Sequence, residues 1–457
     1  MNKTLLILFL ICSNFVLSQS KFNTSLHSTR EGKKDAYKKA NGGMELITNI
    51  PMEELACPKC HSTTEKYPDG SAINSLFYSP VCNDCHDFSK GTAVTEQTCL
   101  NCHNRQVYER AAYPDVDVHK KKGMTCIDCH SKQELHGDDG VAYVSLKQSG
   151  AIKVKCEDCH ANMPSNNSHS LHLGKVDCAA CHAAGLLTCS GCHFETVLAT
   201  GKNRAINQIK NYRMLVKKNG EVRLGGVMSH SYNGKTNFII SSYHSHAITK
   251  NATTCSDCHA NMGGNIAAIN EYNTSKTMTI NKWNATTRKI AGPTGVVPLP
   301  GDWRTALKFD FVTYNGDVNN LTSDATKWEL LKSTADNGHL YFAEPLDNAT
   351  LTKLGFTNLP TSVNEIEEIP VSYSLYQNYP NPFNPTTNIK FSLPKSTNVR
   401  INIYDALGKL VTTLINGNQS AGTYEVEFNA GNLSTGIYFY QLSTPEFSAT
   451  KKLLLMK

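Results

Sequence analysis

The chain has 457 residues, a length typical of about three domains, and it contains 17 cysteines and 17 histidines, far more than a globular protein of ordinary composition. Charged residues make up 18% and hydrophobic residues 40% of the chain, which excludes a disordered charged tail and a polytopic membrane protein. The net charge of +6 is too dilute to indicate nucleic-acid binding. The excess of cysteine and histidine is therefore the feature that indicates function.

The N-terminus has the pattern of a secretory signal peptide over residues 1–18. Lys3 precedes an apolar run over residues 5–17, and Ser18 offers a small residue for cleavage. Cleavage there would remove Cys12. A lipid anchor on Cys12 is the weaker alternative because two bulky residues precede it. We therefore expect an exported chain with 16 cysteines in an oxidising compartment.

These cysteines form eight pairs with one spacing, Cys-x-x-Cys, and a histidine follows each pair at once. The paired cysteines are Cys57/Cys60, Cys82/Cys85, Cys99/Cys102, Cys126/Cys129, Cys156/Cys159, Cys178/Cys181, Cys189/Cys192 and Cys255/Cys258. The histidines that follow them are His61, His86, His103, His130, His160, His182, His193 and His259. A disulfide framework, a zinc knuckle or a redox dithiol would not repeat this motif without exception. The sequence therefore predicts eight covalently attached c-type haems.

The motif suits this chemistry because positions i, i+3 and i+4 share one face of a helical turn. Both thiols can then reach the vinyl groups of one porphyrin while the imidazole ligates the iron. No motif carries Lys in place of its His, so the signature of the pentahaem nitrite reductases is absent.

The second axial position of each iron separates two functions. A haem with two protein ligands carries electrons, whereas an open position can bind a substrate. Outside the motifs, the chain before residue 260 holds eight candidate distal ligands: His27, His119, His136, His169, His172, His230, His244 and His246. The equal numbers favour bis-histidine haems. His27 is the least secure ligand because it lies near the cleavage site, and His339 is a spare.

Residues 19–362 are expected to form one octahaem domain of mainly short α-helices and irregular loops around stacked haems, with the motifs at 57–259. At one haem per about 25 residues, the chain cannot bury enough apolar side chain by itself, so the haems should be the core. The shortest interval separates the sixth and seventh motifs, so we expect their haems to lie close together.

Two Asn-Gly pairs, at 219–220 and 233–234, predict a small β-hairpin insertion that carries His230, His244 and His246. We interpret the insertion as structural rather than as a substrate or partner surface.

The cysteine-free stretch at 261–362 is expected to close the cytochrome domain over haem faces, with a separate small domain as the alternative. Within it we expect a proline-bearing loop over Val297–Asp302 and a helix over Ala325–Ser333.

A linker over 363–373 precedes a second unit, 374–457, that has the pattern of an all-β immunoglobulin-like sandwich. Short strands alternate with Gly, Pro, Asn and Ser turns. The expected strands are Asn388–Leu393, Asn398–Tyr404, Lys409–Ile415, Thr423–Asn429, Gly436–Ser443 and Ala449–Met456.

The second unit resembles the type A C-terminal sorting domain of the type IX secretion system. The resemblance rests on the run Tyr376–Pro385, on Ile403-Tyr404-Asp405 with Gly408-Lys409, on Leu433–Tyr438 and on the terminal Lys451-Lys452-Leu453. Such domains direct a folded protein across the outer membrane and are then typically removed. The resemblance implies haem attachment in the periplasm first, and then release or anchoring at the cell surface. A carbohydrate-binding or adhesion module is the alternative.

The haem region resembles octahaem c cytochromes, a group that includes tetrathionate reductases and hydroxylamine oxidoreductase-like proteins. The resemblance rests on the eight motifs, the close sixth and seventh, and the long gap before the eighth. Members of that group use a Lys ligand or a cross-linked Tyr at the active haem. No motif in this chain marks a residue for either role, so no catalytic residue is assigned.

Two functions follow. The favoured one is a secreted or cell-surface electron carrier with eight haem c groups, whose partners are other redox proteins or extracellular acceptors and the type IX machinery. A homo-oligomer or filament is a variant, and neither nucleic acid nor a transmembrane segment in the mature chain is expected.

The alternative is an oxidoreductase acting on a small nitrogen or sulfur compound such as tetrathionate, hydroxylamine or nitrite at one open haem. Haem storage has no supporting feature.

Overall fold

The structure is a computed structural model, and it divides into two compact units, 1–360 and 361–457. The signal peptide, the first motif at Cys57–His61 and most of the linker lie outside the described residues. The described residues are 22–51, 80–137, 140–164, 166–200, 205–320, 324–333, 337–360, 373–378, 380–394, 397–419 and 422–456.

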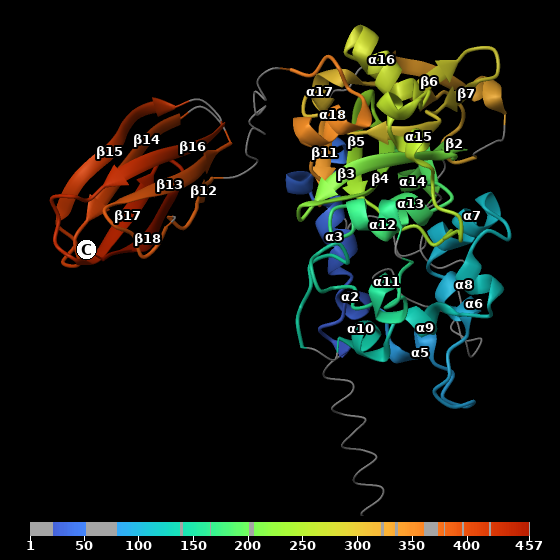
Figure 1. Cartoon of the computed structure of the whole chain (residues 1–457), viewed down its shortest axis with the longest axis horizontal. Helices are drawn as coiled ribbons and strands as arrows, with labels where there is room; N and C mark the ends of the chain where they lie inside the picture. Colours follow the sequence, from blue (N-terminus) through green and yellow to red (C-terminus); the bar gives the residue numbers. More distant parts are fainter. Residues whose placement is uncertain are drawn as a thin grey trace, which may run out of the picture. The chain divides into compact units, whose positions relative to one another are not determined.

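The part of the first unit that carries most motifs consists of short helices joined by irregular loops, as expected (Figure 1). Most have one or two turns, so they depend on tertiary contacts rather than on helix propensity. They are α2 (Leu26–Thr29), α3 (Glu31–Tyr37), η1 (Lys39–Asn41), α4 (Glu45–Thr48), α5 (Cys82–Cys85), α6 (Glu96–Leu100), α7 (Asn104–Ala112), α8 (Val118–Lys121), α9 (Cys126–Cys129), α10 (Lys132–His136), α11 (Cys156–Cys159), α12 (Asn167–His172), α13 (Cys178–His182), α14 (Phe194–Thr200), α15 (Cys255–Cys258) and η4 (Ala260–Met262).

The two expected hairpins are present, and they belong to a seven-stranded sheet that is larger than the predicted insertion. The turns at 219–220 and 233–234 have positive φ at both residues, as the type I′ geometry of Asn-Gly turns requires. The strands of this sheet are β1 (Thr188–His193), β2 (Ala205–Ile209), β3 (Tyr212–Lys218), β4 (Glu221–Tyr232), β5 (Lys235–Ser242), β8 (Gly295–Pro298) and β11 (Gly338–Tyr341).

The cysteine-free stretch contributes to this sheet and also builds a second one. Parallel pairing adds β8 to β3 and β11 to β5, which joins segments far apart in the chain. The second sheet has the order β10-β9-β6-β7. Its strands and the flanking helices are β6 (Met278–Asn284), β7 (Lys289–Ala291), β9 (Leu307–Tyr314), β10 (Trp328–Ser333), α16 (Ala267–Ser275), α17 (Trp303–Ala306) and α18 (Asn348–Leu354).

Two local predictions in this stretch are wrong. The helix expected over Ala325–Ser333 is only a 3₁₀ turn, η5 (Ala325–Lys327), because Trp328 and the residues after it pair with β9. The loop expected from Val297 starts later, since Val297 and Pro298 belong to β8. In both places a long-range strand partner determines the local structure.

The two sheets share a hydrophobic core made of side chains, which the sequence analysis did not expect. Phe238, Phe309 and Phe311 are fully buried in it, and the rings of Phe238 and Phe309 stack with centroids 4.1 Å apart. Tyr272 on α16 and Met278 on β6 are buried in the same cluster. The expectation that haems alone form the core therefore fails for the β-rich part of this unit.

The second unit contains all six expected strands plus a short one, in two facing sheets with the orders β12-β13-β16 and β15-β14-β17-β18. Ile389, Phe391, Ile401 and Tyr440 are among the fully buried side chains between the sheets. The unit is thus a β-sandwich. Its strands are β12 (Ser374–Leu375), β13 (Thr386–Leu393), β14 (Thr397–Tyr404), β15 (Leu410–Gln419), β16 (Gly422–Asn429), β17 (Gly436–Ser443) and β18 (Ser448–Leu455).

Within the described ranges, none of the helices has the length and apolar character needed to cross a bilayer.

Candidate haem-binding site

Four of the cysteine motifs are single helical turns that begin and end at the two cysteines: α5, α9, α11 and α15. Each has Asp immediately before its second cysteine, a recurrence that the sequence analysis did not use. The carboxylates accept a hydrogen bond from the backbone N–H just before the turn, at 2.6 to 2.8 Å. These capping residues are Asp84, Asp128, Asp158 and Asp257. They fix the turn that presents both thiols on one face.

Two further described motifs, the third and the sixth, lie at the end of α6 and on α13. Cys99 lies within α6, and His103 follows the end of that helix. The sixth motif forms the whole of α13, and Asp177 caps it by accepting a hydrogen bond from the Ala179 backbone N–H at 3.0 Å. In both cases the cysteine and histidine spacing falls on a helical turn, as expected.

The seventh motif departs from this pattern because it forms strand β1. Adjacent residues of a strand point to opposite faces of the sheet, so Cys192 lines the large cavity described below while His193 does not. The His193 ring packs against Tyr314 and Trp328, and its Nε2 lies 3.0 Å from a Glu195 carboxylate oxygen. The seventh motif therefore does not place its cysteine and histidine side chains on one face of a helical turn, contrary to expectation.

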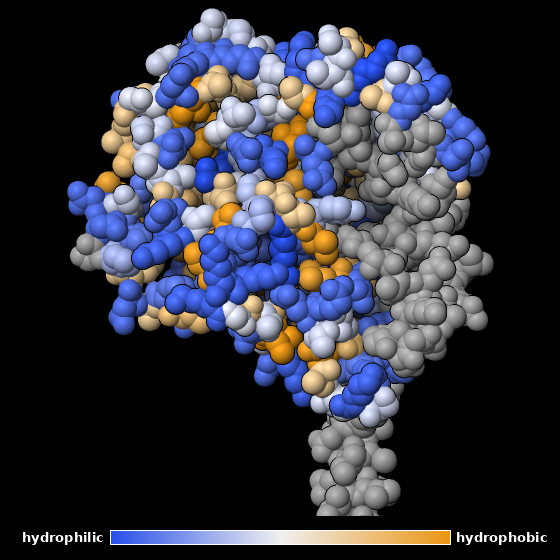
Figure 2. Space-filling model, turned by 90° about the vertical axis from the view of Figure 1, so that its right-hand side faces the viewer, coloured by the Kyte–Doolittle hydropathy of each residue, from blue (hydrophilic) through white to orange (hydrophobic). Residues whose placement is uncertain are grey.

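The motifs surround one cavity of about 4350 Å³, several times the 300–1,000 Å³ or so of an ordinary ligand pocket. Figure 2 shows apolar side chains at the surface among hydrophilic ones. Several of the exposed large apolar side chains line the cavity: Val81, Phe88, Tyr108, Ile127, Leu146, Leu171, Leu173 and Met262. A cavity with apolar walls and repeated thiols fits several porphyrins.

Six motif histidines each face one histidine from outside the motifs, with ring centroids 6.0 to 6.3 Å apart. The pairs are His86 with His136, His103 with His27, His130 with His246, His160 with His119, His182 with His169, and His259 with His172. Imidazole nitrogens bind a metal at about 2.0 Å. Two rings on opposite sides of one iron would have centroids about 6 Å apart, so the spacing fits one iron between each pair.

Short helices supply most of the distal rings. His27 lies on α2, His119 on α8 and His136 on α10, whereas His169 and His172 share α12. The three-residue spacing on α12 directs its two rings to different motifs, the sixth and the eighth.

Backbone carbonyls orient many of these rings through Nδ1, which leaves Nε2 directed toward the metal. His86 Nδ1 lies 2.9 Å from the Thr92 carbonyl oxygen, and His259 Nδ1 lies 2.7 Å from that of Lys353. The partners of the other oriented rings are the carbonyls of Thr249 for His182, Pro164 for His169 and Ser168 for His172. This donor arrangement matches a set of Nε2 ligands.

Two expected distal ligands, His230 and His244, have no imidazole partner among the described residues. His230 is fully buried on β4 directly beside Cys192, and neither of its ring nitrogens has a hydrogen-bond partner within the described part of the chain. Burial lowers the pKa of His230 to about 4 and that of His244 to about 4. Both rings are therefore neutral at pH 7, the form that ligates metals. The spare candidate His339 lies on β11 and packs against Gly42.

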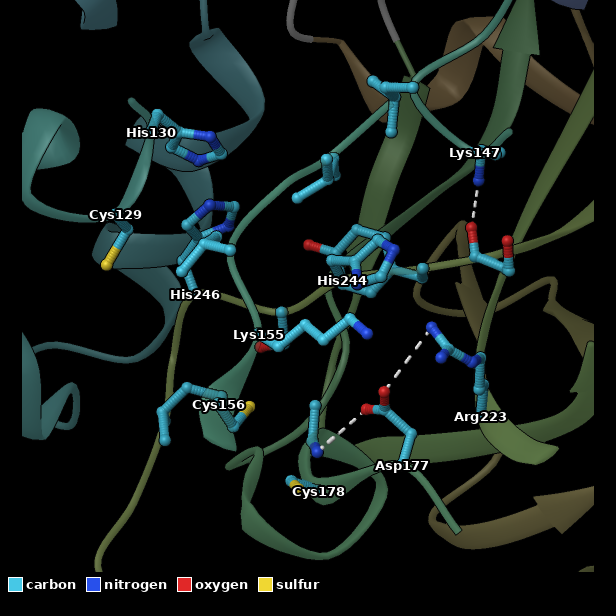
Figure 3. Close-up of a pocket in the computed structure, with 18 of the residues that line it drawn as sticks. Cys129, His130, Lys147, Lys155, Cys156, Asp177, Cys178, Arg223, His244 and His246 are labelled. Atoms are coloured by element: carbon cyan, nitrogen blue, oxygen red, sulfur yellow. Dashed lines mark hydrogen bonds and ion pairs between the residues drawn. The ribbon is translucent and has the colours of Figure 1, made fainter. Parts of the chain in front are cut away.

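Cationic side chains gather around His244, as Figure 3 shows. Lys147 donates hydrogen bonds to Ser241 Oγ at 3.0 Å and to the Ser242 carbonyl. Burial lowers the pKa of Lys147 to about 7, with Arg105 and Lys218 adding to the shift. Haem propionate carboxylates beside these basic side chains would favour the charged form of Lys147.

Thiols from different motifs lie near enough to interact electrostatically, and these neighbours connect six of the described motifs in one row. The neighbouring thiols are Cys85 and Cys102, Cys99 and Cys126, Cys129 and Cys159, Cys156 and Cys178, and Cys181 and Cys258. The row follows the chain from the second motif to the sixth and then reaches the eighth. Contacts of α6 with both α5 and α9 support its first steps.

Burial raises the pKa values of several of these thiols. The pKa of Cys85 is raised to about 12 by burial, with Asp84 and nearby thiols adding to the shift. Burial raises the pKa of Cys258 to about 11, and the Cys181 thiol adds to it. A hydrogen bond with the Cys156 thiol raises the pKa of Cys178. These side chains are therefore protonated at neutral pH, and no described cysteine side chain forms a disulfide.

Two family models match separate parts of the chain. Residues 45–104, which include the first three motifs, match cytochrome c7 and related cytochrome c. Residues 377–456 match the secretion system C-terminal sorting domain. None of the curated proteins matches the chain.

Three solved structures each cover less than a fifth of this chain. PorZ, a surface component of the type-IX secretion system of Porphyromonas gingivalis, is 21% identical over 18% of this chain and 12% of its own, with a TM-score of 0.14. Latent PorU from the same bacterium is 17% identical over 18% and 9%, with a TM-score of 0.16. The Ig1 domain of mouse SynCAM 2 is 14% identical over 16% and 81%, with a TM-score of 0.12. The chain thus spans about a tenth of the length of each of the first two structures.

The family models thus identify a cytochrome c7-like region at residues 45–104 and a sorting domain at residues 377–456. The match over residues 45–104 implies covalently bound haem c in that region. The C-terminal unit of the chain matches a secretion sorting domain, which implies export to the cell surface or the medium.

Proposed function

We propose that this protein is an octahaem cytochrome that carries electrons through bis-histidine haems in extracellular or respiratory electron transfer. The spacing of 6.0 to 6.3 Å within six imidazole pairs carries the proposal. Bound haem supplies a one-electron ferric/ferrous couple at each site. The paired rings hold both axial positions, so they keep small substrates away from the metal.

The remaining two haems follow from the count of motifs. One belongs to the first motif, which lies outside the described residues, and the other to Cys189 and Cys192. His230 and His244 are the two distal candidates left for their irons. The burial of His230 beside Cys192, with neither ring nitrogen hydrogen-bonded within the described ranges, supports such a role.

The row of neighbouring thiols supports a conduit rather than eight separate centres. Thiols of adjacent motifs can meet only if the thioether edges of their haems are near each other. Among the described residues, the row runs from Cys82 and Cys85 at one end to Cys255 and Cys258 at the other. We propose that electrons enter and leave at these two ends, and that the acceptor is a redox protein or an extracellular oxidant.

Spin-state counting on the purified protein tests this function. We expect electron paramagnetic resonance to show low-spin ferric haem throughout, and we expect the reduced protein not to bind carbon monoxide. A high-spin haem together with turnover of a small substrate would overturn the carrier function.

The seventh motif favours a second candidate function, a multihaem oxidoreductase. His193 has no second imidazole facing it among the described residues, and its Nε2 is close to Glu195 instead of lining the cavity. An iron bound only by His193 would keep an open position for a small nitrogen or sulfur compound such as tetrathionate, hydroxylamine or nitrite. The spin-state experiment distinguishes the two functions, because one high-spin haem per chain with turnover supports the oxidoreductase.

A further inference from the structure

The pair formed by His130 and His246 differs from the other pairs in what its Nδ1 atoms face. His130 Nδ1 lies 2.7 Å from Glu134 Oε1, and His246 Nδ1 lies 3.7 Å from Glu109 Oε2. The rings of this pair lie close together in the cavity (Figure 3). Among the described residues, it is the pair in which both rings have a carboxylate beside Nδ1.

Most rings of the other pairs with a described Nδ1 partner have a neutral one. The Nδ1 atoms of His86, His182 and His259 face backbone carbonyls, and so do those of both α12 histidines. One other ring, His119, has a carboxylate 3.4 Å from Nδ1, from Asp117, and that carboxylate also caps α8. Among the described contacts, the His130 and His246 pair therefore has two carboxylates beside its Nδ1 atoms, whereas each other pair has one or none.

Additional contacts hold both carboxylates in place. Glu134 Oε2 accepts a hydrogen bond from the Lys153 backbone N–H at 3.1 Å. Glu109 is 1% exposed, and it accepts hydrogen bonds from Ser245 Oγ at 2.7 Å and from the His246 backbone N–H at 3.2 Å. Neither carboxylate can turn to solvent without breaking these bonds, so both stay beside the imidazoles.

Glu134 lies at hydrogen-bond distance from Nδ1, and a carboxylate that accepts such a hydrogen bond makes the imidazole a stronger electron donor to a metal at Nε2. Glu109, 3.7 Å from the opposite Nδ1, acts mainly through its charge. Stronger donation stabilises the ferric state, which carries one more positive charge than the ferrous state. A fixed negative charge near the site acts in the same direction. Both effects lower the reduction potential of the haem between these rings.

We propose that Glu109 and Glu134 are positioning residues that give the haem attached at Cys126 and Cys129 the lowest reduction potential among the six paired sites. This inference rests on the proposed bis-histidine ligation. Reduction adds one electron to ferric iron to give ferrous iron, and the Nδ1 protons stay on both imidazoles. The site lies in the interior of the row, so electrons reside on its neighbours and cross it during transfer.

Redox titration of the holo-protein, followed by haem absorption, tests the inference with Glu109→Gln and Glu134→Gln. Gln keeps an oxygen that can accept the Nδ1 hydrogen bond but removes the charge. We expect the midpoint potential of the lowest-potential component to rise in each variant. At a fixed potential, its ferrous/ferric ratio should increase at least about tenfold, which corresponds to about 59 mV for one electron. Glu134→Asp should retain the low potential.

Glu221→Gln is the matched control, because Glu221 lines the same cavity and pairs with Arg223 instead of an imidazole. We expect this control to leave the lowest component in place. Glu134 also acts electrostatically on His27, so Glu109→Gln is the more specific variant. The two Gln variants address opposite rings of one pair. If one of the two variants loses haem, the reduction potential measured in the other variant tests the inference.

Two failures can be told apart. If the lowest component stays unchanged in the Gln variants, or moves equally in the Glu221 control, the inference is wrong, while low-spin electron paramagnetic resonance signals would still uphold the carrier function. If the wild-type protein lacks bis-histidine low-spin signals, the proposed function itself fails and the inference fails with it.

Discussion

The rings of His169 and His182 lie within 16° of parallel, with centroids 6.3 Å apart, although they come from two different helices. Backbone carbonyls of Pro164 and Thr249 hold their Nδ1 atoms at 2.9 and 3.2 Å. Both Nε2 atoms are thus available to one metal ion. This pair represents the arrangement on which the proposed electron transfer depends.

His169→Ala should open one axial position. We predict the loss of one low-spin signal, the gain of one high-spin haem, and the binding of one carbon monoxide per reduced chain. His339→Ala serves as the control, because His339 forms none of the six pairs, and it should leave the spin count unchanged. An unchanged spin count in His169→Ala would show that His169 is not a ligand.

Asp347→Ala should weaken the attachment of α18. Asp347 accepts the Thr350 backbone N–H at 2.8 Å as the helix cap, and it pairs with Lys217 Nζ at 2.8 Å. We predict a loss of about 1 kcal/mol in the free energy of unfolding, mostly from the cap, because the carboxylate is 46% exposed and the ion pair is worth little. Asp347→Asn keeps a capping oxygen and should cost less.

The Asp347 effect should depend on pH. The hydrogen bond with Lys217, together with that from Thr350, lowers the pKa of Asp347 to about 2. A lowered folded-state pKa contributes stability above the usual carboxyl pKa of about 3.9, and this contribution is lost as the pH falls through the folded-state value. The difference in melting temperature between wild type and Asp347→Ala should shrink from pH 5 toward pH 2. A constant difference would contradict the ionic contribution.

Tyr440→Phe should destabilise the C-terminal sandwich. The fully buried Tyr440 hydroxyl donates to the Tyr376 carbonyl at 2.7 Å and accepts the Asn378 backbone N–H at 2.8 Å. Loss of the hydroxyl leaves two buried backbone groups without a partner, at a cost of about 1–3 kcal/mol. Hydrogen exchange in peptides from 374–456 should report this loss. Tyr404→Phe, which removes a half-buried hydroxyl, should change exchange less.

Removal of residues 361–457 should leave a haem-loaded protein inside the cell envelope. We expect haem staining in the periplasmic fraction of a host with type IX secretion, whereas the full chain should reach the surface or the medium. Arrival of the shortened chain at the surface would contradict a sorting role for the second unit.

Local features of the sequence predicted local features of the structure well. The Asn-Gly pairs formed their turns, and the six C-terminal strands lie where alternation and turn residues placed them. The turns and the strands both depend on residues that are close together in the sequence. Each described histidine pair also contains one of the expected distal candidates, whose role as a ligand stays a prediction.

Long-range contacts account for what the sequence did not predict. Trp328 lies in a strand because β9 pairs with it, and the seventh motif is a strand because β1 lies between β2 and β4. The partner of His172 proved to be His259, 87 positions further along the chain. No periodicity in a single segment encodes such pairings.

The contact between the Cys156 and Cys178 thiols has a consequence for biosynthesis. In an oxidising compartment, two adjacent thiols from different motifs would form a disulfide that blocks two haem sites at once. The hydrogen bond with Cys178 lowers the pKa of Cys156, which favours the reactive thiolate, whereas burial raises the pKa of Cys85 and of Cys258. Maturation must therefore couple haem to each motif on a reduced and still open chain, before the row of motifs closes.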